Sequence, residues 1–199
     1  MLHNVTFIDE SDGQVMLPIE CDPKVFERFG PAFDTVAKQI PLEQRKLLAN
    51  YLKDNVSQFR IVIEDKVLLE VEKDGKRETA AGLVEPNVAS IRFAGTVVAE
   101  MSDDQVLELI AHELGHAVLY VEEKTGHLPN DFVDEFIALG GLGSTLSADK
   151  VNYLNEKYAD KYAEEWGFPQ SDLTNFQVGY AKRHDLKPIS RPTVIGDDM

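Results

Sequence analysis

Residues 102–121 read SDDQVLELIAHELGHAVLYV, and this stretch decides how the chain folds. Ser102 and Gln105 match a capping box, in which a serine and the side chain three residues later bind the first free N–H groups of a helix. The two aspartates between them suit the positive end of the helix dipole. From Val106 onward nearly every residue is apolar, and a helix that is apolar on most sides is buried. The sequence therefore predicts a buried helix that begins just after Ser102.

This helix carries the pentapeptide His-Glu-Leu-Gly-His at residues 112–116. At a spacing of four, His112 and His116 share one helix face, one turn apart. Two imidazoles that converge from one rigid face are half of a tetrahedral zinc site. Glu113, beside them, can take a proton from a water at the metal. We therefore expect a metal site, whereas the alternative is two ordinary histidines on a helix.

Gly115, inside the pentapeptide, is out of place in a helix. A glycine in a helix interior costs about 1 kcal/mol relative to alanine. Close approach of another element, or room beside the metal, explains this cost. We expect one of the two at Gly115.

A zinc site needs a third protein ligand. His127 is one candidate, and its alternative role is that of a solvated side chain past the helix end. Glu122 falls where one branch of the zincin metallopeptidases places its third ligand, six residues after the second histidine. That branch turns the chain at a glycine three residues after the histidine, where this chain has Leu119. We expect the helix to run on and to carry Glu122 away from the metal.

The stronger candidate lies in a second predicted helix, residues 149–168. Ser147 or Asp149 can cap its start, and a glycine followed by a proline ends it. Glu156 and Asp160 share one face of this helix, one turn apart. Glu156 is placed to bind zinc, while Asp160 accepts the other ring N–H of a liganding histidine. The alternative is a solvated acidic face. The apolar stripe of the helix comprises Val151, Leu154, Tyr158, Tyr162 and Trp166.

These two segments together resemble the gluzincins, zinc metallopeptidases with a HExxH helix and a glutamate on a second helix. The resemblance covers about residues 88–168 and includes the Glu-x-x-Ala-Asp pattern at 156–160. It implies one zinc ion per chain, held by His112, His116 and Glu156, with Glu113 as the general base. It also implies an α+β fold, in which a small mixed or antiparallel sheet packs on the active-site helix and a mainly helical C-terminal part carries the third ligand.

The implied activity is hydrolysis of peptide bonds in a peptide or protein substrate. In zincins an edge strand holds the substrate in extended form, and residues 88–94 or a neighbouring strand would do so here. A donor to the developing oxyanion is expected as well. Two other interpretations stay open: zinc in a non-hydrolytic regulatory or interaction domain, with His127 closing the shell, and a metal-free interaction module. The candidate oxyanion donors are Tyr153, Tyr162, Tyr180 and His184.

Composition excludes several classes of protein. Of 199 residues, 43% are hydrophobic, which is typical of a globular chain. The net charge of −15, without a dense basic patch, argues against nucleic-acid binding. No apolar run approaches the roughly 18 residues of a membrane span. Cys21 is the single cysteine, and the start of the chain shows no basic flank or apolar stretch, so we expect no disulfide and a cytoplasmic location.

We predict three regions: an N-terminal extension of short strands and helices (1–57), a zincin-like metallopeptidase domain (58–186) and a C-terminal tail (187–199). Strands are expected at 3–9 and 14–20, and at the alternating apolar residues of 59–63, 67–71 and 89–93. Asp22-Pro23 opens a helix, 31–55 is helical with a division at Pro41, and another short helix spans 131–139. Asp74-Gly75 marks a hairpin turn.

Overall fold

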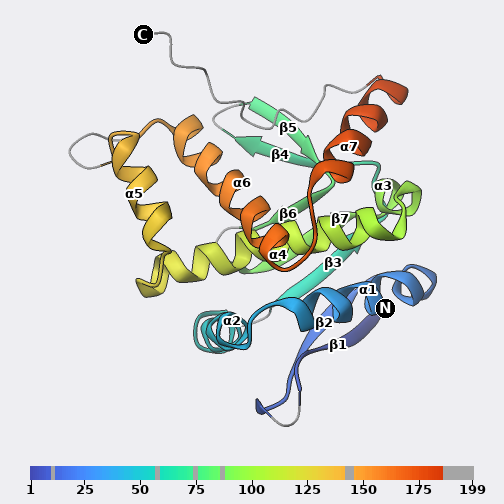
Figure 1. The fold of residues 1–199 in the computed structure, drawn as a ribbon. Helices are drawn as coiled ribbons and strands as arrows, with labels where there is room; N and C mark the ends of the chain where they lie inside the picture. The colour runs from blue at the N-terminus through green and yellow to red at the C-terminus, as the bar shows by residue number, and fades with distance from the viewer. Residues whose placement is uncertain (10–11, 57–58, 74–75, 86–87, 142–145, 186–199) are drawn as a thin grey trace.

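The fold combines one larger sheet, one small hairpin and helices (Figure 1). It is seen in a computed structural model that describes residues 1–9, 12–56, 59–73, 76–85, 88–141 and 146–185. The described part holds seven helices and seven strands, which confirms the predicted α+β class. No helix within these ranges is both long and apolar enough to cross a membrane.

The larger sheet has the strand order β1-β2-β3-β7-β6 and is mixed. β1 and β2 are antiparallel, β2, β3 and β7 run parallel, and β6 returns antiparallel to β7. A second sheet consists of the antiparallel pair β4 and β5. The bounds are β1 Leu2–Ile8, β2 Val15–Glu20, β3 Arg60–Glu64, β4 Leu69–Lys73, β5 Lys76–Ala80, β6 Gly82–Val84 and β7 Ser90–Ala94.

Helices α1 and α2 each pack against α4, and all three contact the larger sheet (Figure 1). The strands alternate, so that Ile61 and Ile63 of β3 and Phe93 of β7 are buried on one face. Phe29 of α1 meets Phe93 edge to face, with ring centroids 4.9 Å apart. The helices are α1 Pro23–Gln39, α2 Leu42–Asn55, α3 Gly95–Glu100, α4 Asp103–Thr125, α5 Asn130–Ala138, α6 Ala148–Glu165 and α7 Ser171–Arg183.

The predicted capping box begins α4. The Ser102 hydroxyl accepts a hydrogen bond from the backbone N–H of Gln105, and the Gln105 side chain accepts one from the N–H of Ser102. The helix runs past Leu119 to Thr125, as expected, and Gly126 ends it in the left-handed region at φ 74°. His112, His116 and Glu122 therefore lie on one continuous helix.

The predicted helix start at Asp22-Pro23 is confirmed, but the helical segment expected from Pro31 belongs to the same helix. α1 begins at Pro23, where the Asp22 carboxylate accepts a hydrogen bond from the N–H of Lys24, and it continues through Pro31. Proline removes one backbone hydrogen bond, and here the buried packing of Phe29 and Phe33 outweighs that loss. Pro23 therefore marks a helix start, whereas Pro31 does not mark a boundary.

Some elements were not predicted from the sequence, namely α3, α7 and the three-residue strand β6. The division of the chain at residue 57 stays a prediction, although β1 and β2 pair in the same sheet as β3. The predicted turn at 74–75 and the predicted tail at 187–199 lie outside the described residues.

Candidate metal centre

Three side chains with metal-binding atoms converge between α4 and α6: His112, His116 and Glu156. The Nε2 atoms of the two histidines are 3.1 Å apart. The Glu156 carboxylate places Oε2 at 3.4 Å from Nε2 of His112, and Oε1 at 3.7 Å from Nε2 of His116. Ligands at about 2.0–2.1 Å from a tetrahedral zinc ion lie about 3.3 Å from one another. The two imidazole nitrogens and the Glu156 carboxylate are therefore close to the spacing that one zinc ion requires.

Within the described ranges, no other group of three such side chains converges in this way. The donor set is two imidazole nitrogens and one carboxylate oxygen. This set is the one found in catalytic zinc sites with three protein ligands, which leave a fourth position for water or substrate. The residues present therefore fit zinc by donor chemistry as well as by spacing.

The helix crossing that brings these ligands together depends on Gly115. A Cβ atom added there would lie 2.7 Å from the backbone oxygen and 3.0 Å from the Cα of Ala159 on α6. Only a residue without a side chain allows the two backbones to approach this closely. Of the two explanations that the sequence allows for Gly115, the structure therefore supports the close approach of another element. This close approach of α4 and α6 brings Glu156 near the two histidines.

Asp160 fixes the orientation of the His112 ring. Its Oδ1 atom is 2.7 Å from Nδ1 of His112. When Nδ1–H donates to this carboxylate, the lone pair of Nε2 points toward His116 and Glu156, where a metal would accept it. Asp160 therefore has the position that the sequence assigned to it.

Carboxylates dominate the charge at this site. Burial by itself would lower the pKa of His112, but hydrogen bonds to Asp160 and Glu156 raise it to about 10. Burial also opposes ionisation of Glu156, and yet its hydrogen bonds with His112 and His116 hold its pKa far below the usual value. Three carboxylates, counting Glu113, surround two imidazoles here. A bound cation would relieve the same excess of negative charge that now favours protonated His112.

Glu113 lies between α4 and the sheet edge. Its side chain is only 5% exposed. The carboxylate is close enough to His112 to help raise the pKa of that imidazole. On its other side it packs against Gly82 in β6, since a Cβ added to Gly82 would lie 2.7 Å from both Cγ and Cδ of Glu113. The predicted base therefore stands beside the candidate ligands and beside an edge strand.

The two weaker ligand candidates are not brought to this cluster. Glu122 is buried, accepts a hydrogen bond from the Tyr162 hydroxyl, and accepts a second from Nε2 of Gln44 at 3.2 Å. His127 is exposed past the end of α4, with its Nδ1 2.9 Å from the Thr125 hydroxyl. The structure therefore separates both from the candidate site.

The four candidate oxyanion donors are scattered. Tyr162 is engaged with Glu122, as described above. His184 lies at the end of α7, where its Nε2 atom is 3.6 Å from Glu100 and its ring stacks on Tyr180 at 4.2 Å. Tyr153 is half-buried on α6, one turn before Glu156. Of the four, only Tyr153 lies within one helical turn of a candidate ligand, three residues before Glu156 on α6.

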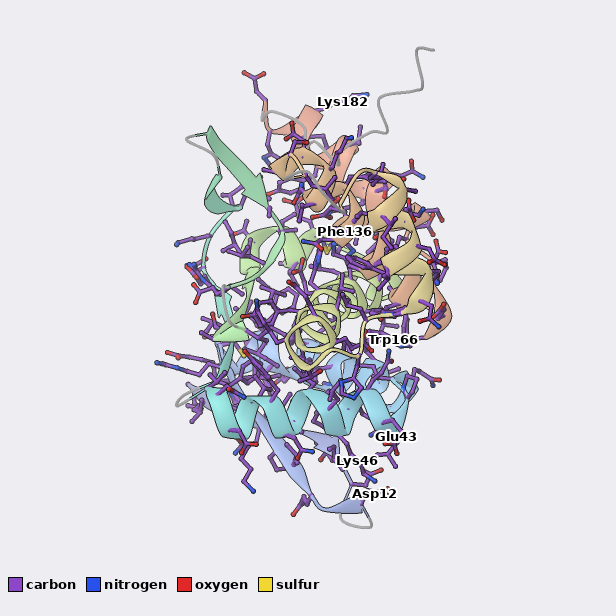
Figure 2. The ribbon with its side chains drawn as sticks, turned by 90° about the vertical axis from the view of Figure 1, so that its left-hand side faces the viewer. Asp12, Glu43, Lys46, Phe136, Trp166 and Lys182 are labelled. Atoms are coloured by element: carbon purple, nitrogen blue, oxygen red, sulfur yellow. The ribbon has the colours of Figure 1, made fainter. Side chains whose placement is uncertain are left out.

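Neither Gly82 beside the site nor a polar contact away from it was predicted from the sequence. Gly82 carries no local signal, because its role appears only when β6 pairs with β7. Gln44 of α2 bonds both Glu122 and, through its carbonyl, Nε1 of Trp166 at 3.2 Å. Figure 2 shows Trp166 beside α2. The contacts of Gln44 join segments more than 70 residues apart in sequence, where periodicity carries no information.

Comparisons with protein-family models, with curated proteins and with solved structures gave no match for this chain.

Proposed function

We propose that this chain is a zinc-dependent peptidase of the gluzincin type. The observation that carries the proposal is the convergence of His112, His116 and Glu156 at zinc-ligand spacing. Asp160 supports His112 from behind, and Glu113 stands beside the group. Ordinary histidines on a buried helix would not need this combination of partners.

The chemistry follows from the types of residue. Zinc supplies a Lewis acid that lowers the pKa of a coordinated water to about 7. Glu113 is the residue that accepts the proton of the attacking water and then delivers it to the leaving amine. Asp160 keeps His112 in the required tautomer through Nδ1. Tyr153 is the candidate to donate a hydrogen bond to the oxyanion.

Strand β6 is the candidate binding site for the substrate backbone, because it is the last strand of its sheet among the described residues. β7 is an interior strand, so residues 90–94 are already paired on both sides. The N–H of Ala94 donates to the oxygen of Ala81 at 2.8 Å, and the N–H of Glu85 donates to Ser90 at 2.9 Å.

The direction of the backbone groups of β6 follows from these bonds. In an antiparallel pair, residues that bond the neighbouring strand alternate with residues that face away from it. Since residues 81 and 85 face β7, Gly82 and Val84 direct their N–H and C=O groups to the free edge. An extended peptide can pair there, next to Glu113, in the manner of an added strand.

The test combines metal analysis with a substitution. We expect the purified protein to hold one zinc ion per chain and to cleave members of a quenched fluorescent peptide library. Glu113→Gln should keep the zinc and lose at least a hundredfold in kcat, since general base catalysis contributes about 10²–10⁴-fold. Glu164→Gln, which changes an exposed acid on α6, is the matched control and should behave as the unchanged protein.

Two outcomes would count against the proposal. Absence of bound zinc after zinc has been supplied would remove the metal site. Zinc bound at one per chain, with no peptide cleaved, would favour the second interpretation from the sequence, a regulatory zinc-binding domain.

A further inference from the structure

Gly82 is the point at which the larger sheet comes closest to the candidate base. It is buried, it belongs to the edge strand β6, and it pairs with Phe93 of β7. The space that a Cβ would fill at this position is already occupied by the side chain of Glu113, whose Cγ and Cδ would lie 2.7 Å from it. Real Cβ atoms do not approach other carbon atoms so closely. Any other residue at position 82 must therefore displace Glu113 or the strand.

Backbone conformation does not explain a glycine here. The glycines with positive φ are Gly13, Gly126, Gly140 and Gly167 among the described residues, and Gly82 is not one of them. Glycine within a strand weakens it and is depleted from strands. A strand of three residues at the sheet edge is a poor place for such a loss. The remaining physical reason is the close approach of Glu113.

We propose that Gly82 is a positioning residue. Because it has no side chain, the Glu113 carboxylate can occupy the space beside it. This inference rests on the proposed function for its consequence in catalysis, but its steric part does not. β6 then sets two positions at once, that of the base through Gly82 and that of the substrate through its free backbone edge. Because β6 contacts Glu113 and would also pair with the substrate, this one short strand determines the distance between the general base and the scissile bond.

The proposal predicts an effect on the base without an effect on the metal. Gly82→Ala pushes the Glu113 carboxylate out of its place, whereas His112, His116 and Glu156 come from α4 and α6 and are untouched. A misplaced catalytic group can cost about a hundredfold in rate. We expect Gly82→Ala to lower kcat ten- to a hundredfold, with KM and zinc affinity within about twofold of the unchanged protein.

The matched control is another glycine with room beside it. A Cβ at Gly179 of α7 would meet only Nη1 of Arg183, at 3.4 Å. Gly179→Ala should keep kcat. A Gly82→Ala protein with a kcat within about twofold of the unchanged protein, or an equal loss of kcat in Gly179→Ala, would overturn the proposal.

A second measurement does not depend on activity. In the unchanged background, Gly82→Ala should lower the melting temperature by several degrees, because it overpacks the space beside Glu113. In a Glu113→Ala background the clash is gone, so the same substitution should leave the melting temperature within about 1 °C or raise it. Additive shifts across this double-mutant cycle would overturn the steric claim. A coupled cycle in a protein that cleaves no peptide would instead show that the steric claim stands and the proposed function fails.

Discussion

Asp160 is not itself a candidate ligand, but it contacts the ring of the candidate ligand His112 directly. It holds Nδ1 of His112 at 2.7 Å. We expect Asp160→Ala to weaken zinc binding by about ten- to a hundredfold, because loss of the carboxylate frees the ring to rotate and makes Nε2 less basic. Competition with a chromogenic zinc chelator measures this change.

The control for Asp160 is another acid on the same helix. Glu164 of α6 is exposed, so Glu164→Ala should keep the zinc affinity. If Asp160→Ala also keeps it, the hydrogen bond to His112 contributes nothing to a metal site, and Asp160 is only a surface charge.

At the scale of residues, the sequence predicted the members of the site that share a helix. His112 and His116 stand one turn apart on α4, and Glu156 and Asp160 stand one turn apart on α6, so helical geometry alone relates each pair. Gly82 was not predicted, because its contact with Glu113 depends on pairing between β6 and β7. No local pattern encodes such a pairing.

At the scale of elements, the crossing of α4 and α6 rests on Gly115. Helix propensity alone would make Gly115→Ala stabilising by about 1 kcal/mol. The structure predicts the opposite sign, because the new Cβ would lie 2.7 Å from a backbone oxygen that cannot rotate away. We expect a loss of about 1–3 kcal/mol in the free energy of unfolding, together with weaker zinc binding, since the crossing sets the position of Glu156.

Urea unfolding and the chelator competition measure both effects. Gly179→Ala, in an open position on α7, should show the ordinary gain or no change. A more stable Gly115→Ala protein with normal zinc affinity would mean that the two helices do not meet at this point.

Elements with their own signals were predicted and the others were not. The capping box and the apolar run define α4 without reference to the rest of the chain. By contrast, α7 begins at Ser171, and its N-cap residue Gln170 makes no side-chain capping bond. The carboxylate of Glu108, buried on α4, accepts the N–H of Leu173 at 2.8 Å in its place. The start of α7 is thus determined by a residue more than 60 positions away, which a local reading of sequence cannot find.

At the scale of the whole molecule, a partly buried polar cluster joins α2, α4 and the end of α6. It consists of Gln44, Glu122, Tyr162 and Trp166, and Glu122 is at its centre. Burial raises the pKa of Glu122, and hydrogen bonds from Tyr162 and Gln44 offset this only in part. The folded state therefore holds the Glu122 proton more tightly than the unfolded chain does.

The sign of the pH dependence follows from this difference. The stability contributed by Glu122 is fully present below its unfolded pKa, near 4.5, and is lost as pH rises through the higher folded value. Glu122→Gln stays neutral at every pH. We therefore expect the free energy of unfolding of the variant, relative to that of the unchanged protein, to increase as pH rises from about 4 to about 8. Urea unfolding at each pH measures this difference. Glu164→Gln should show no such trend, and a constant difference for Glu122→Gln would contradict the raised pKa.

The sequence predicted the class of the fold, but not how its parts are joined. Alternating apolar residues at β1, β2, β3 and β7 predicted strands, whereas their order in one mixed sheet depends on packing against α1, α2 and α4. The cluster around Glu122 was likewise invisible, since Gln44 lies 78 positions before Glu122.

The distance between the two halves of the candidate centre along the chain also bears on biosynthesis. Glu156 comes 40 residues after His116, on a helix that must dock before the third ligand is in place. A ribosome-bound chain that has reached only α5 already carries the pentapeptide, yet it can offer an ion no more than two of the three donors. Under the proposed function, peptide cleavage would then be absent from unfinished or truncated copies and would arise only when translation has passed α6.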